Sequence, residues 1–223
     1  MTRRAEEPWT TLSTTPIYTN KWLSLREDLV ALPDGRTTIY GVVSCGQCVG
    51  ILPFVDQDTV LLVRQYRYVA RRPTWEMPTG GVHQGESAEE AAQRELAEEV
   101  GCRAGRLIHV CTYHTSKSVM DETAHLFLAA DLVDAPRPPD ETEFIDIRAF
   151  PFTEALRMVL SGEIQDSMTI IVAALGFALL RESPRRDSWI HLIAARGPRA
   201  YPGRIGSLSR RKGRRSRRRR EAV

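Results

Sequence analysis

The sequence predicts an α/β protein in which helices sandwich a mixed sheet, with an antiparallel β-hairpin element at the N-terminus. Strand-like and helical segments are interspersed along the chain, but without the regular strand-helix-strand alternation of a purely parallel sheet. At 223 residues the chain is long enough for one well-buried core. We expect three regions: an N-terminal β element over residues 1–45, a main domain over 46–182 and a basic, unordered tail over 183–223.

The N-terminal hairpin is predicted from alternating apolar and polar residues. The alternation covers residues 16–32, the turn residues Pro33-Asp34-Gly35 follow, and a second strand-like run covers residues 37–43. Two further apolar runs, residues 50–55 and 60–68, flank a short polar turn. They predict a second hairpin.

A glycine-rich loop and a helix come next. The loop reads Pro78-Thr79-Gly80-Gly81 and follows a turn near residues 71–73. Ser87-Ala88-Glu89-Glu90 has the form of a capping box, so we expect the helix to begin at Ser87. It runs to Val100 and ends at Gly101, which is a typical C-terminal signal. The remaining predictions are strands at 107–113, 124–129 and 144–150, and helices at 152–160 and 168–181.

The composition is that of a soluble globular protein, with 42% hydrophobic and 26% charged residues. The N-terminal stretch has no apolar run typical of a signal peptide, and the longest apolar run, residues 169–180, is too short to span a bilayer. We therefore expect a cytoplasmic protein with no membrane partner. Cys45 and Cys48 have no second pair at short spacing, so we interpret the four cysteines as free thiols rather than a zinc site or a disulfide framework.

The net charge of +3 is unevenly distributed. From residue 204 onward, ten Lys and Arg residues against one Glu give the segment a charge of +9, so residues 1–203 carry −6. Such a segment could bind nucleic acid electrostatically. It lacks the interleaved aromatic residues that stack on bases, and a tail without a specific function is the preferred interpretation.

Three glutamates cluster on the helix predicted after Ser87. Glu95, Glu98 and Glu99 fall within an arc of about 100° at 3.6 residues per turn. Like charges so close together destabilise a bare helix, and a divalent cation compensates for them. Mg²⁺ prefers carboxylate oxygens and commonly bridges them to substrate phosphates. Arg94 can brace Glu98 four residues later; the alternative is a solvated acidic face.

The spacing around these glutamates resembles the Nudix box: Gly, five residues, Glu, seven residues, Arg-Glu, an apolar residue, any residue, Glu-Glu, any residue, Gly and an apolar residue. Every specified position is filled, by Gly80, Glu86, Arg94, Glu95, Leu96, Glu98, Glu99, Gly101 and Cys102. The resemblance implies a Nudix-type α/β/α sandwich and a hydrolase that depends on Mg²⁺, with Mn²⁺ as an alternative ion.

Further segments resemble the ADP-ribose pyrophosphatase branch of that family. They are Val60 to Arg67 followed by Trp75-Glu76-Met77-Pro78, then Asp121-Glu122 before a strand, then Asp140 to Ile145. The resemblance covers roughly residues 15 to 182. The loop over residues 113–120 contains no proline, whereas ADP-ribose-selective members carry one there, so the substrate remains open.

The resemblance implies a role for each matching residue. Glu95 and Glu99 would be the main metal ligands, assisted by Glu98 and the Thr79 carbonyl and braced by Arg94. The other implied roles are a further metal ligand (Glu143), the base that deprotonates water (Glu141), a grip on the diphosphate (Arg67), contacts near the substrate (Glu76 and, from a partner subunit, Glu122) and stacking on adenine (Tyr18 and Trp22). Plain salt bridges, charged loops and turns, and core packing of Tyr18 and Trp22 are the alternatives.

Together these roles imply that water attacks a P–O–P bridge in a nucleoside diphosphate linked to a group X, with metal ions neutralising the diphosphate and activating the water. The preferred substrates are ADP-ribose or a nucleoside diphosphate sugar, which would give a nucleoside monophosphate and phosphorylated X. Dinucleotide coenzymes or oxidised nucleoside triphosphates are alternative substrates. A non-catalytic nucleotide-sensing or nucleic-acid-binding module is the alternative from another class. We also expect a homodimer, because the N-terminal hairpin of this branch packs on a second subunit.

Overall fold

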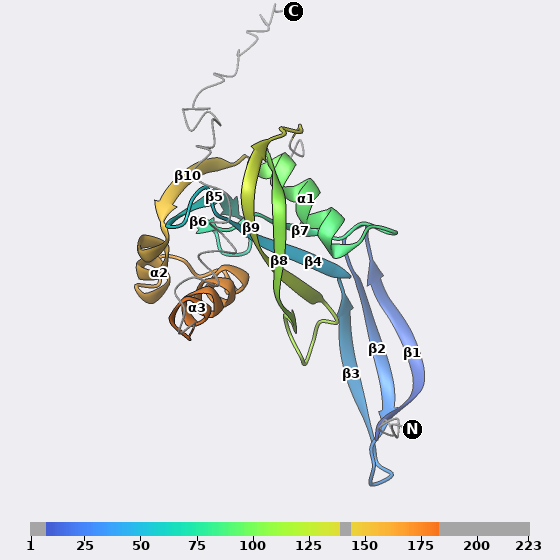
Figure 1. The fold of residues 1–223 in the computed structure, drawn as a ribbon. Helices are drawn as coiled ribbons and strands as arrows, with labels where there is room; N and C mark the ends of the chain where they lie inside the picture. The colour runs from blue at the N-terminus through green and yellow to red at the C-terminus, as the bar shows by residue number, and fades with distance from the viewer. Residues whose placement is uncertain (1–7, 139–143, 183–223) are drawn as a thin grey trace, which may run out of the picture.

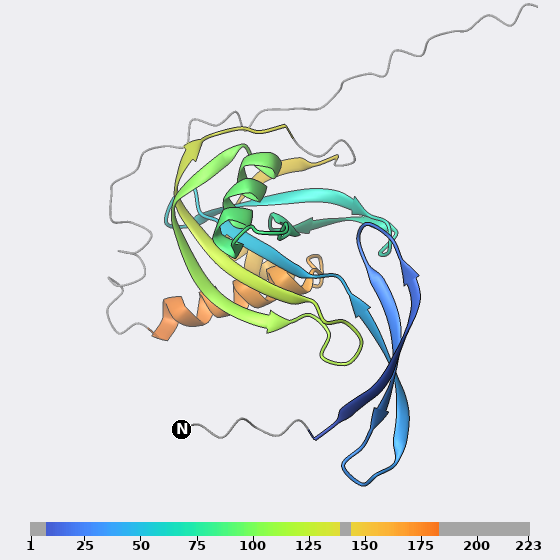
Figure 2. The ribbon, with the colours of Figure 1, turned by 90° about the vertical axis from the view of Figure 1, so that its right-hand side faces the viewer.

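The structure, a computed structural model, describes residues 8–138 and 144–182. A body of two sheets and three helices carries a third, N-terminal sheet that extends away from it (Figure 1). The N-terminal sheet has the order β1-β2-β3, and the sheets of the body have the orders β7-β4-β9-β8 and β10-β5-β6. The strands of the body lie between α1 on one side and α2 and α3 on the other (Figure 2). The predicted α/β sandwich with a mixed sheet is confirmed.

The N-terminal sheet contains one strand more than predicted. β2 (Ser24–Ala31) and β3 (Thr37–Ser44) form the expected antiparallel hairpin around Pro33-Asp34-Gly35. β1 (Thr10–Thr19) pairs antiparallel with the other edge of β2. A turn at Asn20 separates β1 from β2, since the Asn20 side-chain oxygen accepts hydrogen bonds from the backbone N–H groups of Trp22 and Leu23.

The second predicted hairpin is wrong. β4 (Gln47–Pro53) and β5 (Thr59–Arg67) belong to different sheets and share only an isolated bridge between Phe54 and Val60. β4 instead lies between β7 (Thr79–Gly81), which is antiparallel to it, and β9 (Thr123–Asp134), which is parallel. Consecutive buried residues in both strands leave no alternation that would specify a pairing partner.

The three helices follow the predictions within one residue at each end. β8 and β9 are longer than predicted, β10 is shorter and shifted, and β6 and β7 occupy segments that were predicted as a turn and a loop. β5 forms a hairpin with β6 and pairs with β10 on its other edge, and α1 begins after the N-cap Ser87 and ends before Gly101, whose φ is +73°. Their bounds are β6 Arg72–Glu76, α1 Ala88–Glu99, β8 Cys102–His114, β10 Asp146–Pro151, α2 Phe152–Leu160 and α3 Ser167–Glu182.

Two hydrophobic clusters fill the body. One lies between the sheets and α2 and α3, around Leu62, Leu126 and Met158. The other lies beneath α1, around Ile51, Leu96 and Phe127. None of the helices in the described ranges is long and apolar enough to cross a membrane. All four cysteines are free thiols; Cys102 is buried, and the other three are half-buried.

Candidate active site

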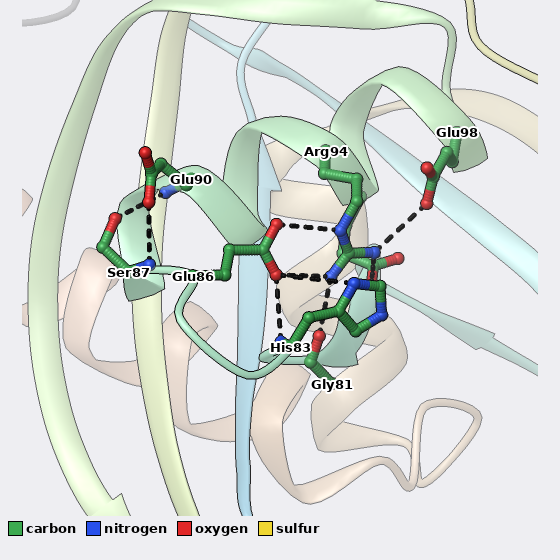
Figure 3. Close-up of polar contacts among 8 residues, drawn as sticks. Gly81, His83, Glu86, Ser87, Glu90, Arg94 and Glu98 are labelled. Carbon is green, nitrogen blue, oxygen red and sulfur yellow. Dashed lines mark hydrogen bonds and ion pairs between the residues drawn. The ribbon is translucent and has the colours of Figure 1, made fainter.

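The start of α1 is fixed by its capping box. The Ser87 hydroxyl accepts a hydrogen bond from the backbone N–H of Glu90 at 3.2 Å, and the Glu90 carboxylate accepts one from the backbone N–H of Ser87 at 2.9 Å (Figure 3). These reciprocal bonds satisfy two backbone donors and set the rotation of the helix that carries the glutamates.

Arg94 joins α1 to the loop that precedes it. Its Nε and Nη2 donate to the two carboxylate oxygens of Glu86 at 2.9 and 3.0 Å, and Nη2 also donates to the Gly81 carbonyl at 2.7 Å (Figure 3). Nη1 donates to Glu95 at 2.6 Å and to Glu98 at 3.2 Å. The hydrogen bonds from Arg94 hold the pKa of Glu86 below its usual range, and Glu86 in turn raises the pKa of Arg94. One guanidinium is therefore the internal counter-ion of three acids.

Glu95 packs directly against the glycine-rich loop. A Cβ atom on Gly80 would lie 1.8 Å from Glu95 Oε1, so only glycine leaves room for this carboxylate. The same addition at Gly81 would meet nothing within 4 Å. The first glycine of the box thus has a steric reason, the close approach of the Glu95 carboxylate.

Glu95 and Glu99 are both buried, with 6% and 3% of their surfaces exposed. Glu99 accepts a hydrogen bond from the Thr79 backbone N–H at 3.2 Å. Glu98 is half-buried on the neighbouring flank of the helix. Burying two carboxylates on one helix face is unfavourable unless positive charge or hydrogen-bond donors compensate for it. These two glutamates are therefore not a solvated acidic surface.

Arg67 and Glu76 form a second charged pair beside the same loop. Arg67 Nε donates to both oxygens of Glu76, at 2.9 and 3.1 Å, and its Nη2 donates to the Thr79 hydroxyl at 3.2 Å. Glu76 is 2% exposed, and this burial raises its pKa despite the opposing effect of Arg67. The salt bridge given above as the alternative for these residues is present, and the Nη2 hydrogen bond connects Arg67 to Thr79.

The described glutamates alone do not form a metal-binding cluster. Among residues 8–138 and 144–182, no three Asp, Glu, His or Cys side chains are grouped so that they could hold a metal ion. Arg94 donates to both Glu95 and Glu98, so these two carboxylates are engaged in ion pairs. Glu141 and Glu143, the remaining predicted acids, lie outside the described residues. The donor set still fits a hard divalent cation, because it offers carboxylate oxygens beside a glycine cradle.

Glu122 lies at the end of the β8–β9 loop, far along the chain from the box. The Asp121 N–H donates to the Val43 carbonyl at 3.1 Å, which ties this loop to the end of β3. Glu122 is half-buried beside Cys48. Burial and the Glu122 carboxylate together raise the pKa of the Cys48 thiol to about 12, so this thiol is not a nucleophile near neutral pH.

Tyr18 and Trp22 lie on and just beyond β1, and the alternative of core packing is contradicted within the single chain. Their exposed fractions are 55% and 71%, and the only ring contact of Trp22 in the described residues is with Lys21, whose Nζ lies 4.2 Å from the ring centroid. Both side chains are available to a ligand or to a second subunit.

Sequence reasoning missed Thr169 and Asp166. The Thr169 hydroxyl, at the start of α3, accepts a hydrogen bond from the Met77 N–H at 3.0 Å, next to Glu76. Met77 and Thr169 are 92 positions apart in the sequence. No spacing rule connects them, and only the prediction that α3 begins near residue 168 placed Thr169 on a helix.

The comparisons with known proteins agree with this geometry. The NUDIX domain model matches residues 46–169, and the model of the nucleoside diphosphate sugar hydrolase N-terminal domain matches residues 9–43. The chain therefore belongs to the Nudix family. It has the fold, the complete box and the relatives of a Nudix pyrophosphohydrolase.

Three relatives align over most of their length. The ADP-ribose pyrophosphatase of Bacillus subtilis is 31% identical over 175 residues, which cover 78% of this chain and 94% of the relative. The ADP-ribose pyrophosphatase of Mycobacterium tuberculosis is 32% identical over 193 residues, covering 83% and 93%. The methanol dehydrogenase activator of Bacillus methanolicus is 30% identical over 175 residues, covering 78% and 94%. A solved ADP compounds hydrolase shares the fold, with a TM-score of 0.73 at 22% identity over 82% of this chain and 99% of that one.

Proposed function

We propose that this protein hydrolyses the diphosphate bond of a nucleoside diphosphate linked to X, with ADP-ribose or a nucleoside diphosphate sugar as substrate and Mg²⁺ as the ion. The observation that carries the proposal is the pair of buried carboxylates, Glu95 and Glu99, held against the loop of Thr79 and Gly80. Relatives named for ADP-ribose hydrolysis support the choice of substrate.

Four groups of the described chain would hold the ion: Glu95, Glu98, Glu99 and the Thr79 carbonyl. Glu143 would add a ligand. When bound, a divalent ion neutralises the diphosphate and lowers the pKa of the water that attacks it. Mn²⁺ has the same preference for oxygen ligands and would substitute for Mg²⁺.

The remaining site residues have roles that need no metal. Arg67, whose side chain is 42% exposed, binds the diphosphate oxygens, and buried Glu76 keeps its guanidinium oriented. Glu141 takes the proton of the attacking water. Glu122 contacts the substrate, and Arg94 keeps the glutamates of α1 in register with the loop.

We further propose that the N-terminal sheet forms a homodimer. A shallow groove of about 270 Å³ lies on this sheet, lined by Trp9, Asp28, Val30 and Tyr40. Apolar side chains on the sheet are exposed in the single chain, including Leu12, Ile17 and Ile39. A second subunit would cover them, while Tyr18 and Trp22 stack on the adenine. Residues 1–45 are then the dimerisation element, residues 46–182 the catalytic domain, and residues 183–223 a basic tail without a specific role.

The test is a panel of ADP-ribose, nucleoside diphosphate sugars, dinucleotide coenzymes and oxidised nucleoside triphosphates, incubated with Mg²⁺ and followed by phosphate release with and without added phosphatase. For a nucleoside diphosphate linked to X, we expect phosphate only when phosphatase is added, because the products are monoesters. Phosphatase attacks triphosphates directly, so their cleavage is followed by release of pyrophosphate. The products should be a nucleoside monophosphate and phosphorylated X. If no compound of the panel is cleaved by the full chain at millimolar Mg²⁺ or Mn²⁺, the proposal is wrong.

A further inference from the structure

The segment from Glu76, the last residue of β6, to Thr79, the first residue of β7, carries two members of the candidate site at its ends. Each residue of this connection has its own anchor. Glu76 pairs with Arg67, the Pro78 carbonyl accepts a hydrogen bond from Ile51 N–H at 3.0 Å, and the Thr79 N–H donates to Glu99. Such complete anchoring indicates that the path of this segment matters for the groups it carries.

The anchor of the remaining residue, Met77, comes from α3. Its N–H donates to the Thr169 hydroxyl at 3.0 Å, and both residues are buried, with 0% and 1% of their surfaces exposed. The Met77 side chain packs where a Cβ on Gly50 would be, at 2.2 Å from Met77 Cε. Met77 is therefore held at both its backbone and its side chain.

The direction of the Thr169 hydrogen bond is fixed by Asp166, the residue before α3. Asp166 Oδ2 accepts from the Thr169 backbone N–H at 2.7 Å, as an N-cap does, and from the Thr169 hydroxyl at 2.6 Å. Because the hydroxyl proton points to Asp166, a lone pair of Oγ1 remains for the Met77 N–H. Valine at this position would keep the shape of the side chain but could not accept that bond.

We propose that Thr169, oriented by Asp166, is a positioning residue that sets the Thr79 carbonyl for metal binding. It contacts neither the ion nor the substrate. It holds the backbone of Met77, two residues before Thr79, and so fixes the position of the loop relative to Glu95 and Glu99. This inference rests on the proposed function, because it assigns a consequence to the metal site.

The alternative is that Thr169 only stabilises the fold. A purely structural role lowers the temperature of unfolding and leaves the affinity for metal unchanged. A positioning role changes the affinity for metal, because supporting hydrogen bonds around metal ligands typically contribute about 10- to 100-fold to it. The two roles are therefore separated by measuring metal binding to the protein without substrate.

The experiment compares Thr169→Val, Thr169→Ser and the control Ser161→Ala in the full chain. Ser161 also donates a hydroxyl hydrogen bond, at 3.2 Å to the Met158 carbonyl, but it lies at the end of α2 and has no contact with the loop. Mn²⁺ binding is followed by electron paramagnetic resonance, and the Mg²⁺ concentration for half-maximal hydrolysis and the unfolding temperature are measured alongside.

We expect Thr169→Val to weaken Mn²⁺ binding by about tenfold and to raise the half-maximal Mg²⁺ concentration similarly. Thr169→Ser keeps the hydroxyl and should stay close to wild type, as should Ser161→Ala. If Thr169→Val does not fold, Asp166→Ala at the half-buried cap should show a smaller loss of the same kind. Wild-type Mn²⁺ affinity in whichever of these two variants folds overturns the positioning role and leaves the proposed function intact. A wild-type protein that neither binds Mn²⁺ nor cleaves any nucleoside diphosphate overturns both.

Discussion

Helix α1 and the N-terminal sheet distribute polarity in opposite ways. On α1, two carboxylates are buried and one arginine serves as counter-ion to three glutamates. On the N-terminal sheet, apolar side chains such as Leu12 and Ile17 face outward, while Asp28 is one of its two buried residues. Both arrangements are unfavourable in isolation. The difference teaches that the buried acids of α1 have counter-charges and donors within the chain, whereas the exposed apolar side chains of the sheet are covered by a second subunit only under the proposed homodimer.

The largest effect is expected from removing a buried charge on α1. Glu99→Gln should reduce hydrolysis about a thousandfold, because under the proposed function it removes a metal ligand that contributes several kcal/mol to the transition state. The temperature of unfolding should change little, since Gln keeps the shape and the oxygen that accepts from Thr79. Phosphate release and thermal unfolding measure the two quantities. Glu89→Gln, on the exposed first turn of the same helix, is the control; an equal loss there would contradict the distinction between buried and exposed acids.

A second prediction uses two adjacent glycines. Gly80→Ala should lower activity about a hundredfold, because the added methyl group collides with the Glu95 carboxylate and misplaces it. Gly81→Ala should have little effect, since the added methyl group meets nothing. Steady-state kinetics of both variants, with circular dichroism to check folding, make the comparison. Equal activity of the two variants would contradict the explanation that Gly80 is needed to make room for the Glu95 carboxylate.

The third prediction concerns the N-terminal sheet. Ile39→Lys places a charge on a side chain that is 63% exposed, so the single chain should keep its stability, but a dimer through this surface should weaken about 30-fold or more. Light scattering over a range of concentrations measures the change. Leu160→Lys, at an 88% exposed position on α2, is the control. A wild-type chain that is monomeric at all concentrations would contradict the homodimer.

The smallest effect concerns stability and pH. The pKa of Glu86 is lowered in the folded state by hydrogen bonds from Arg94, so the stability it contributes is present above its unfolded pKa of about 4.5 and is lost as the pH falls through the lower, folded value. Glu86→Gln should therefore cost about 1–2 kcal/mol at pH 7 and progressively less in acid. Urea unfolding between pH 3 and 7 measures this difference. If the loss of stability caused by Glu86→Gln were larger at pH 3 than at pH 7, the pKa of Glu86 could not be lowered in the folded state.

The sequence predicted local structure better than it predicted strand pairing. The capping box, the end of α1 at Gly101 and the bounds of α2 depend on neighbouring residues, and these predictions are confirmed. The pairing of β4 with β9 joins Gln47 to Thr123, and no local pattern indicates it. The hairpin predicted between β4 and β5 was wrong for the same reason.

The candidate site shows the same division. The box predicts that Glu95, Glu98 and Glu99 share one side of a helix, because helical periodicity alone decides it. The close approach of Glu95 to Gly80 and the ion pair of Arg67 with Glu76 need the folded loop, although the family resemblance had placed all four near the site. Thr169 could not be found without the structure, since its partner lies on another layer of the fold.

The ion pairs of Arg94 bear on whether folding of the protein requires a metal ion. Because Arg94 pairs with Glu86, Glu95 and Glu98, part of the negative charge at this site is neutralised without an inorganic ion, so we expect the protein to fold in the absence of metal. Under the proposed function, the rate of hydrolysis then follows the concentration of free divalent ions. A chelator should abolish hydrolysis and leave the temperature of unfolding unchanged.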